Sequence, residues 1–217
     1  RLLVYCQTPE GGFPSTPKEI AGIDLIEDIA AGDLDGDGWD DIATVGISQG
    51  PGAVEVHCQV EGGTWREPSK LIAAKNPILV AIGDVDGDHL EDLVVGDKGG
   101  AVDVYLQEAG GVPKARSCQI VPGRMPSALI IADGESDARK MVVADSSSLS
   151  IWLPGARRDD GVFSDTPALR ISQESPILAA SAADLDLDGR TDLVLARKDA
   201  ASIDRQGHAG AIFEKRS

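Results

Sequence analysis

The chain has 217 residues, of which 42% are hydrophobic, and its 36 acidic against 20 basic side chains give a formal charge of −16. Such acidity argues against a nucleic-acid partner, because phosphate binding needs clustered Lys and Arg. No apolar run approaches the ~20 residues of a membrane-spanning helix. No signal peptide is recognisable, and because the first residue is Arg1 we expect a processed or excised piece of chain.

Short apolar runs of strand length recur along the chain, bounded by turn residues and without helical periodicity. First strands are expected at 29–32, 79–83 and 178–183, and second strands at 41–45, 92–95 and 192–195. Third strands are expected at 4–7, 56–59, 104–107 and 151–154, with a fifth copy at 212–213, and fourth strands at 70–72 and 168–171. Four short strands in each unit of about 50 residues predict the blade of a β-propeller.

We therefore expect an all-β fold, a single partial β-propeller domain over residues 1–217 with about four repeats. The predicted blade units are 1–27 (half), 28–77, 78–127, 128–176 and 177–217 (incomplete). Both ends of the chain then fall in a third strand, with Tyr5 matching Phe213. Because a simple ring needs complementary ends, we expect a stretch of a larger ring, or a partner chain that completes the propeller.

Between the first two strands of three units lies an acidic loop with Asp at positions 1, 3, 5 and 9. Four carboxylates in one tight loop are the oxygen ligands that Ca²⁺ prefers, and the carbonyl at position 7 can add another. The candidate metal ligands are Asp33, Asp35, Asp37, Trp39 and Asp41; Asp84, Asp86, Asp88, Leu90 and Asp92; and Asp184, Asp186, Asp188, Arg190 and Asp192.

Position 6 of the loop needs a positive φ, which Gly38 and Gly189 allow easily and His89 tolerates. An EF-hand is excluded because position 12 is Thr44, Val95 or Leu195, and not Glu. A degraded copy begins at Asp133, where Met141 replaces the closing Asp and Lys140 adds an opposing charge, so we expect no calcium there.

The simplest alternative is a set of Asp/Gly hairpin turns without metal. We favour calcium because turn chemistry alone gives no reason for Asp at position 9. Up to three Ca²⁺ ions are expected, with a structural role: without a cation the carboxylates would repel one another.

In the motif Asp-x-Asp-x-Asp-Gly-x-x-Asp the closing Asp is followed by an apolar residue, as in Asp41-Ile42 and Asp192-Leu193. This pattern resembles the FG-GAP/VCBS repeat family, which includes the integrin α-subunit head. The resemblance implies a propeller with Ca²⁺ in the loop between the first two strands of a blade. It also implies an extracellular or periplasmic protein that serves in adhesion, protein or glycan binding, or as a scaffold.

On these grounds we expect a non-catalytic module with no catalytic residues, since no Ser/His/Asp set, Gly-rich phosphate loop or helical carboxylate pair is visible. The alternatives are a carbohydrate-binding lectin propeller, for which Trp39, Trp65 and Trp152 do not recur at one register, and the propeller part of an extracellular enzyme or larger assembly. His57 is expected to be a packing residue.

Three cysteines cannot all pair with one another. Cys6 and Cys58 align with Leu106 and Leu153, which predicts small apolar core residues too far apart for a disulfide. Cys118 has no obvious partner. Free buried thiols are favoured, although the sequence leaves the redox state of all three open.

Overall fold

The computed structural model describes residues 1–47, 52–61, 63–71, 76–108, 110–132, 140–158, 161–164, 166–198, 201–205 and 214–215. Within these ranges all regular secondary structure is β-strand, which confirms the expected all-β class. Nor does this part of the chain contain a helix of the length and apolarity that crossing a membrane requires.

Most strands belong to four antiparallel four-stranded sheets among the described residues. Sheet 1 contains β3 (Leu25–Gly32), β4 (Asp41–Ile47), β5 (Gly52–His57) and β8 (Ser69–Leu71). Sheet 2 contains β9 (Pro77–Gly83), β10 (Asp92–Asp97), β11 (Val102–Tyr105) and β12 (Cys118–Ile120). Sheet 3 contains β13 (Pro126–Ala132), β14 (Lys140–Asp145), β15 (Ser148–Trp152) and β18 (Leu169–Ser172). Sheet 4 contains β19 (Ile177–Ala183), β20 (Asp192–Arg197), β21 (Ala201–Arg205) and β22 (Glu214–Lys215).

Three hairpins accompany these sheets. The first, β1 (Leu2–Val4) with β2 (Lys18–Ile20), precedes sheet 1. The others, β6 (Gln59–Val60) with β7 (Thr64–Trp65) and β16 (Pro154–Arg158) with β17 (Gly161–Phe163), are inserted between the third and fourth strands of sheets 1 and 3. They form where the sequence places Gly-containing turns.

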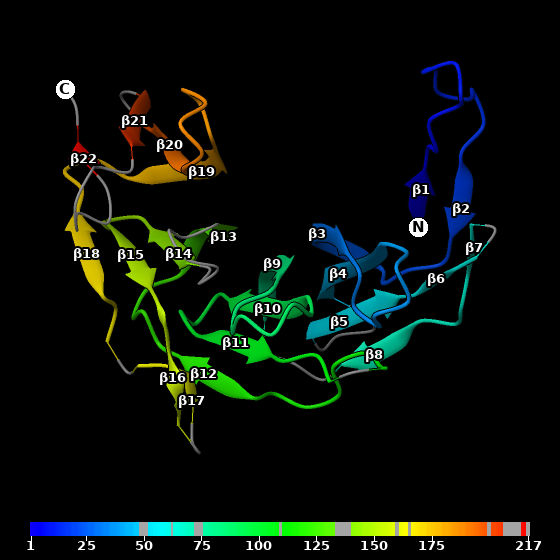
Figure 1. The fold of residues 1–217 in the computed structure, drawn as a ribbon, viewed down its shortest axis with the longest axis horizontal. Helices are drawn as coiled ribbons and strands as arrows, with labels where there is room; N and C mark the ends of the chain where they lie inside the picture. The colour runs from blue at the N-terminus through cyan, green and yellow to red at the C-terminus, as the bar shows by residue number, and fades with distance from the viewer. Residues whose placement is uncertain are drawn as a thin grey trace.

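The four sheets follow one another along an arc, with the hairpin β1–β2 at one end and sheet 4 at the other (Figure 1). The first strand of each sheet contacts the first strand of the next: β3 contacts β9, β9 contacts β13, and β13 contacts β19. Each unit therefore packs mainly on its neighbours in sequence, as in other repeat architectures.

The core lies between successive sheets, because alternate residues of each second strand point to opposite neighbours. Between sheets 1 and 2, Ala43 and Val45 of β4 join Leu93 and Val95 of β10 in one cluster with no exposed surface. The intervening Val94 points the other way, into the cluster between sheets 2 and 3. Each fully buried Val or Leu contributes about 1.5–3 kcal/mol of transfer free energy, so these interfaces hold the arc together.

The strand positions expected from the sequence need correction. The third strands β5, β11 and β15 end at His57, Tyr105 and Trp152, two residues before the expected ends, and of the strand expected at 4–7 only Val4 belongs to a strand, β1. In sheet 4 the third position is occupied by β21, and β22 pairs beyond it as a fourth strand. The expected third strand at 212–213 lies outside the described residues, and the idea that the last unit stops at its third strand is wrong. The predicted unit boundaries stay a prediction, because sheets alone do not define domains.

Candidate metal centre

The three intact acidic motifs form loops at the same place in their sheets. Loop 1 (residues 33–41) joins β3 to β4, loop 2 (84–92) joins β9 to β10, and loop 4 (184–192) joins β19 to β20. In each, the residue before the loop pairs across the sheet with position 9: Gly32 with Asp41, Gly83 with Asp92, and Ala183 with Asp192. The motif therefore spans one tight hairpin connection, as the sequence predicts.

All three loops share one backbone conformation, with positive φ at positions 4 and 6. The angles are 76° and 86° at Gly36 and Gly38, 82° and 69° at Gly87 and His89, and 60° and 82° at Leu187 and Gly189. The sequence predicted the requirement at position 6 and missed it at position 4. Two of the three residues there are glycine, but Leu187 hides the pattern in loop 4.

The carboxylate at position 1 organises each loop through backbone hydrogen bonds. In loop 1, Gly36 N donates to Asp33 Oδ1 at 2.7 Å and Gly38 N donates to Asp33 Oδ2 at 2.8 Å. In loop 2, the corresponding donors to Asp84 are Gly87 N at 2.6 Å and His89 N at 2.9 Å. Loop 4 repeats the second contact, with Gly189 N donating to Asp184 Oδ2 at 2.9 Å.

The carboxylate at position 9 ties the loop to the third strand. Asp41 accepts hydrogen bonds from Leu34 N at 3.1 Å and from Gln59 N at 2.9 Å. Asp92 accepts from Val85 N at 2.9 Å and Gln107 N at 2.8 Å. The expectation that turn chemistry has no use for Asp at position 9 is therefore wrong, since this residue satisfies two backbone donors with or without a metal.

The same carboxylates also converge. One ligand oxygen from each member of three groups lies within 4.8 Å of the others: Asp33, Asp35 and Asp37; Asp84, Asp86 and Asp92; and Asp184, Asp186 and Asp192. An ionised carboxylate has about four acceptor sites, so even Asp33, which accepts three N–H groups, has room for a cation. Asp88 and Asp188 lie outside the groups, and each accepts the N–H of position 7. The carbonyls of Trp39, Leu90 and Arg190 stay predicted ligands.

Burial makes the closing carboxylates of loops 1 and 2 costly to ionise. Desolvation and, to a lesser extent, the charges of Asp35 and Asp37 raise the pKa of Asp41 to about 6, although two backbone hydrogen bonds act to lower it. Desolvation likewise raises the pKa of Asp92 to about 7. A divalent cation among these oxygens would stabilise their ionised form.

The chain also supplies its own cations to two loops, which sequence reasoning missed. Arg66, just after β7, donates from Nη1 to Asp35 Oδ2 at 2.6 Å, and its Nη2 lies 3.9 Å from Asp37 Oδ2. In loop 4, Arg190 Nη2 donates to Asp188 Oδ2 at 2.8 Å. The Arg190 pairing could have been suspected from its place in the motif. The Arg66 pairing depends on how the β6–β7 hairpin lies against loop 1. Nothing in the sequence around Arg66 indicates that contact.

In the degraded unit the structure corrects the alignment. Ala132 pairs with Lys140, so Lys140 and not Met141 stands where Asp41 and Asp92 stand in the other sheets. Lys140 is buried, and Met141 packs in the core between sheets 2 and 3. An ammonium therefore replaces the closing carboxylate. The rest of this loop, 133–139, lies outside the described residues. The expectation that it holds no calcium therefore stays a prediction.

The remaining candidates mostly lie where expected. Trp39 is 43% exposed, while Trp152 and His57 are buried. The cysteines are free, but only Cys58 is buried, and Cys6 is exposed, so its expected place in the core is wrong. The aligned positions lie just beyond the ends of the third strands. The expectation of a core residue is confirmed for Cys58, which belongs to the cluster between sheets 1 and 2.

Comparisons with known proteins agree with this architecture. A family model described as an FG-GAP-like repeat matches residues 33–95, from the start of loop 1 into β10. No curated protein matches the chain significantly.

Among solved structures, the chain is similar to BBS1N in its crystal structure with ARL6DN, soaked with lead. The TM-score is 0.58 at 15% identity, and the match covers 91% of this chain and 59% of that one. A mercury-soaked crystal structure of the same complex gives a TM-score of 0.38 at 12% identity, over 89% of this chain and 81% of that one. At such identity the likeness to the first structure concerns the fold alone, and the chain spans 59% of that protein's length. Residues 33–95 are an FG-GAP-like repeat, and the family resemblance of the acidic loops is confirmed there.

Proposed function

We propose that this chain is a non-catalytic β-propeller module, stabilised by Ca²⁺ in loops 1, 2 and 4, that binds or scaffolds another protein. The observation that carries the proposal is the shared geometry of the three loops. They have the same two positive-φ positions and the same hydrogen bond from the N–H of position 6 to the position-1 carboxylate, although their sequences differ at five of nine positions.

The residues present fit calcium. Ca²⁺ takes six to eight oxygen ligands in flexible geometry, and each loop offers three converging carboxylates with further oxygens nearby. In loop 1, Asp35 Oδ1 is buried without a hydrogen-bond partner among the described residues, as an atom reserved for a cation would be. Bound Ca²⁺ would supply positive charge that offsets the repulsion among the carboxylates.

The role of the loops is structural. The position-1 carboxylate fixes the turn, and the position-9 carboxylate fixes the turn to the third strand. Both carboxylates must stay ionised to serve as ligands, and a cation stabilises that state where burial opposes it. Loops 1 and 2 thereby hold the first three strands of their sheets together.

The exposed face of sheet 4 supports a protein partner. Val142 and Ala144 of β14 are buried against sheet 4, and the equivalent residues of β20 are Val194 and Ala196. Val194 is only half-buried and Ala196 is exposed. Ala179 of β19, which pairs with Ala196, is exposed too.

We propose that a sheet of a partner chain packs on this face as sheet 4 packs on sheet 3, and so extends or completes the propeller. A location outside the cell or in the periplasm and a role in adhesion are proposed on the family resemblance alone.

The test is thermal unfolding in millimolar Ca²⁺, in EDTA and in Mg²⁺. A ligand that binds only the native state stabilises it by RT ln(1 + [L]/Kd), about 2.7 kcal/mol at a hundredfold excess over Kd. We expect a large rise in Tm that is specific to Ca²⁺ and that shrinks in the Asp84→Asn/Asp86→Asn variant of loop 2. Identical melting in all three buffers would contradict the proposal.

A further inference from the structure

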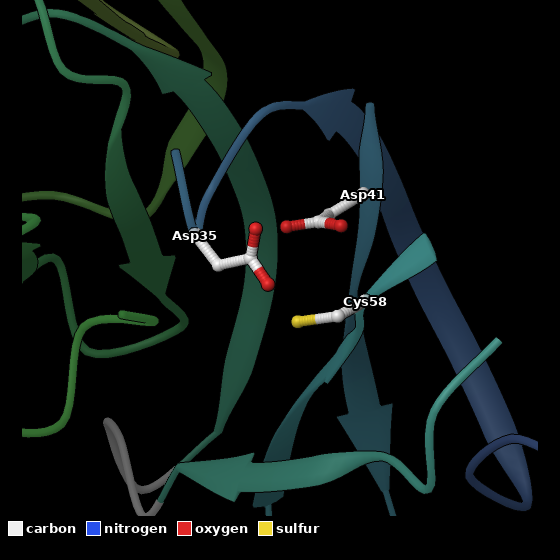
Figure 2. Close-up of side chains that lie close together, drawn as sticks. All are labelled: Asp35, Asp41 and Cys58. Atoms are coloured by element: carbon white, nitrogen blue, oxygen red, sulfur yellow. The ribbon is translucent and has the colours of Figure 1, made fainter. Parts of the chain in front are cut away.

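A thiol, that of Cys58, lies beside the carboxylates of loop 1, and loop 2 has no such neighbour. Cys58 follows β5, at the place where sheets 2 and 3 have Leu106 and Leu153 after their third strands. It is 4% exposed, and its Sγ lies within 4.8 Å of a carboxylate oxygen of Asp35 and of Asp41, which are also buried. Figure 2 shows Asp35 on the loop, Asp41 at the start of β4 and Cys58 just after β5, with the three side chains pointing toward one another.

A second observation indicates that a ligand belongs between these side chains. Asp35 uses only one of its oxygens: Oδ2 accepts the hydrogen bond from Arg66, whereas Oδ1 is buried and has no partner among the described residues. The Asp35 side chain is only 6% exposed, so water does not readily replace the missing partner. A buried carboxylate oxygen without a hydrogen-bond partner destabilises the folded chain, and a bound cation would offset this cost.

We propose that Asp35, Asp41 and Cys58 bind a divalent cation of borderline softness, such as Zn²⁺, which displaces the Ca²⁺ proposed for loop 1, whereas loops 2 and 4 bind Ca²⁺ alone. This inference rests on the proposed function in one respect, that the acidic loops bind cations. Zn²⁺ accepts thiolate and carboxylate ligands in a tetrahedral site, whereas Ca²⁺ takes oxygen alone. Three protein ligands leave the fourth position to water.

The charges of the cluster match such an ion. Two carboxylates and a thiolate carry three negative charges, and Zn²⁺ together with the Arg66 guanidinium carries three positive ones. The β6–β7 hairpin keeps Arg66 beside the cluster, because Arg66 N donates to the carbonyl of Cys58 at 2.8 Å. Arg66 contacts Asp35 through Oδ2 and leaves Oδ1 to the metal.

Binding exchanges the thiol proton for the metal ion, and the proton goes to solvent. Before binding, the thiol donates a hydrogen bond to Asp41. Loop 2 cannot do the same chemistry, since Leu106 offers no ligand atom where loop 1 has sulfur. The difference between the loops therefore depends on one side chain.

The experiment uses the full chain with Cys6→Ser and Cys118→Ser, so that Cys58 is the only thiol. Cd²⁺, a spectroscopic substitute for Zn²⁺, is titrated in the presence of millimolar Ca²⁺, and the ultraviolet charge-transfer band of a cadmium–thiolate bond is measured. We expect the band to saturate at one equivalent of Cd²⁺. It should be lost in Cys58→Leu and weakened in Asp35→Asn.

The matched control separates this inference from the proposed function. Cys58→Leu copies the residue of sheets 2 and 3 and should keep the Ca²⁺-dependent rise in Tm. Retained calcium stabilisation without a cadmium band in the parent would overturn the zinc-type site alone. Loss of calcium stabilisation in the parent would overturn the proposed function. If Cys58→Leu does not fold, Cys58→Ser preserves size and the hydrogen-bond donor, and a band that persists in it would contradict the inference.

Discussion

The carboxylate of Glu91 in loop 2 accepts a hydrogen bond from the backbone N–H of Asp33, the first residue of loop 1, at 2.6 Å. It thereby joins two acidic loops of neighbouring sheets. Gly32 makes the contact possible, because a Cβ there would collide with the Glu91 carboxylate and with Ile82. The middle of β3 is joined to sheet 2 as well, where Val80 N donates to Asp28 Oδ2 at 3.0 Å. Carboxylate-to-backbone contacts thus supplement the apolar interface between sheets 1 and 2.

Glu91→Ala should destabilise the chain, because it leaves the Asp33 N–H without its charged acceptor. We expect a loss of about 1.5–3 kcal/mol in the free energy of unfolding, measured by urea denaturation in EDTA. The control is Glu27→Ala, which removes an exposed ion pair with Lys98 at 3.4 Å and should cost less than about 1 kcal/mol. Equal losses of unfolding free energy in the two variants would show that the Glu91 contact stabilises the chain no more than an exposed ion pair does.

Leu187→Gly should stabilise loop 4. Leu187 has φ = 60° and is 87% exposed, so it carries the strain of the left-handed region without burying its side chain. That conformation costs an L-residue about 1–2 kcal/mol. Gly loses more chain entropy than Leu on folding, which offsets part of this strain. We therefore expect the free energy of unfolding to rise by about 0.5 kcal/mol, measured by chemical denaturation.

Leu185→Gly, two residues earlier in the same loop, is the control. Leu185 is absent from the positive-φ residues, and replacing it should only add entropy to the unfolded chain. It should therefore destabilise. A destabilising Leu187→Gly would mean that the solution conformation of loop 4 does not need positive φ at position 4.

Asp145 should make stability depend on pH in the acid range. Although burial raises its pKa, hydrogen bonds from Ser147 and Ser148 outweigh this effect and hold the pKa below the ordinary value of 3.8. A lowered native pKa contributes stability that is complete above the ordinary value and is lost as the pH falls through the native one. The difference in unfolding free energy between wild type and Asp145→Asn should therefore be constant from pH 7 to about 5 and shrink below about 4. A difference that does not change with pH would rule out this contribution.

The two equivalent alanines of sheets 3 and 4 should respond differently to the same substitution. Ala144→Arg places a charge in a site with no exposed surface and should lower stability by several kcal/mol or prevent folding. Ala196→Arg, on the exposed face of sheet 4, should change unfolding by no more than about 0.5 kcal/mol. It should, however, abolish any association through that face, measured by analytical ultracentrifugation. An Ala196→Arg variant as damaged as Ala144→Arg would mean that the face is already covered.

The sequence by itself determined the repeat, the all-β class and the three acidic loops. These features are local: the period, the strand-length apolar runs and the turn residues act within a few positions of one another, so they can be read without knowing the fold. The resemblance to FG-GAP repeats rests on the same local motif and is confirmed for residues 33–95. Metal binding by these loops stays a prediction.

Tertiary structure decided what depends on contacts between distant residues. The β6–β7 hairpin brings Arg66 to Asp35, and the curvature of the arc brings Glu91 to Asp33. Strand register, set by packing, puts Lys140 rather than Met141 at the closing position. Cys58 is the core residue that the repeat predicts, and folding also places its sulfur beside two buried carboxylates. Such contacts follow from the packing of whole sheets, and no local pattern encodes them.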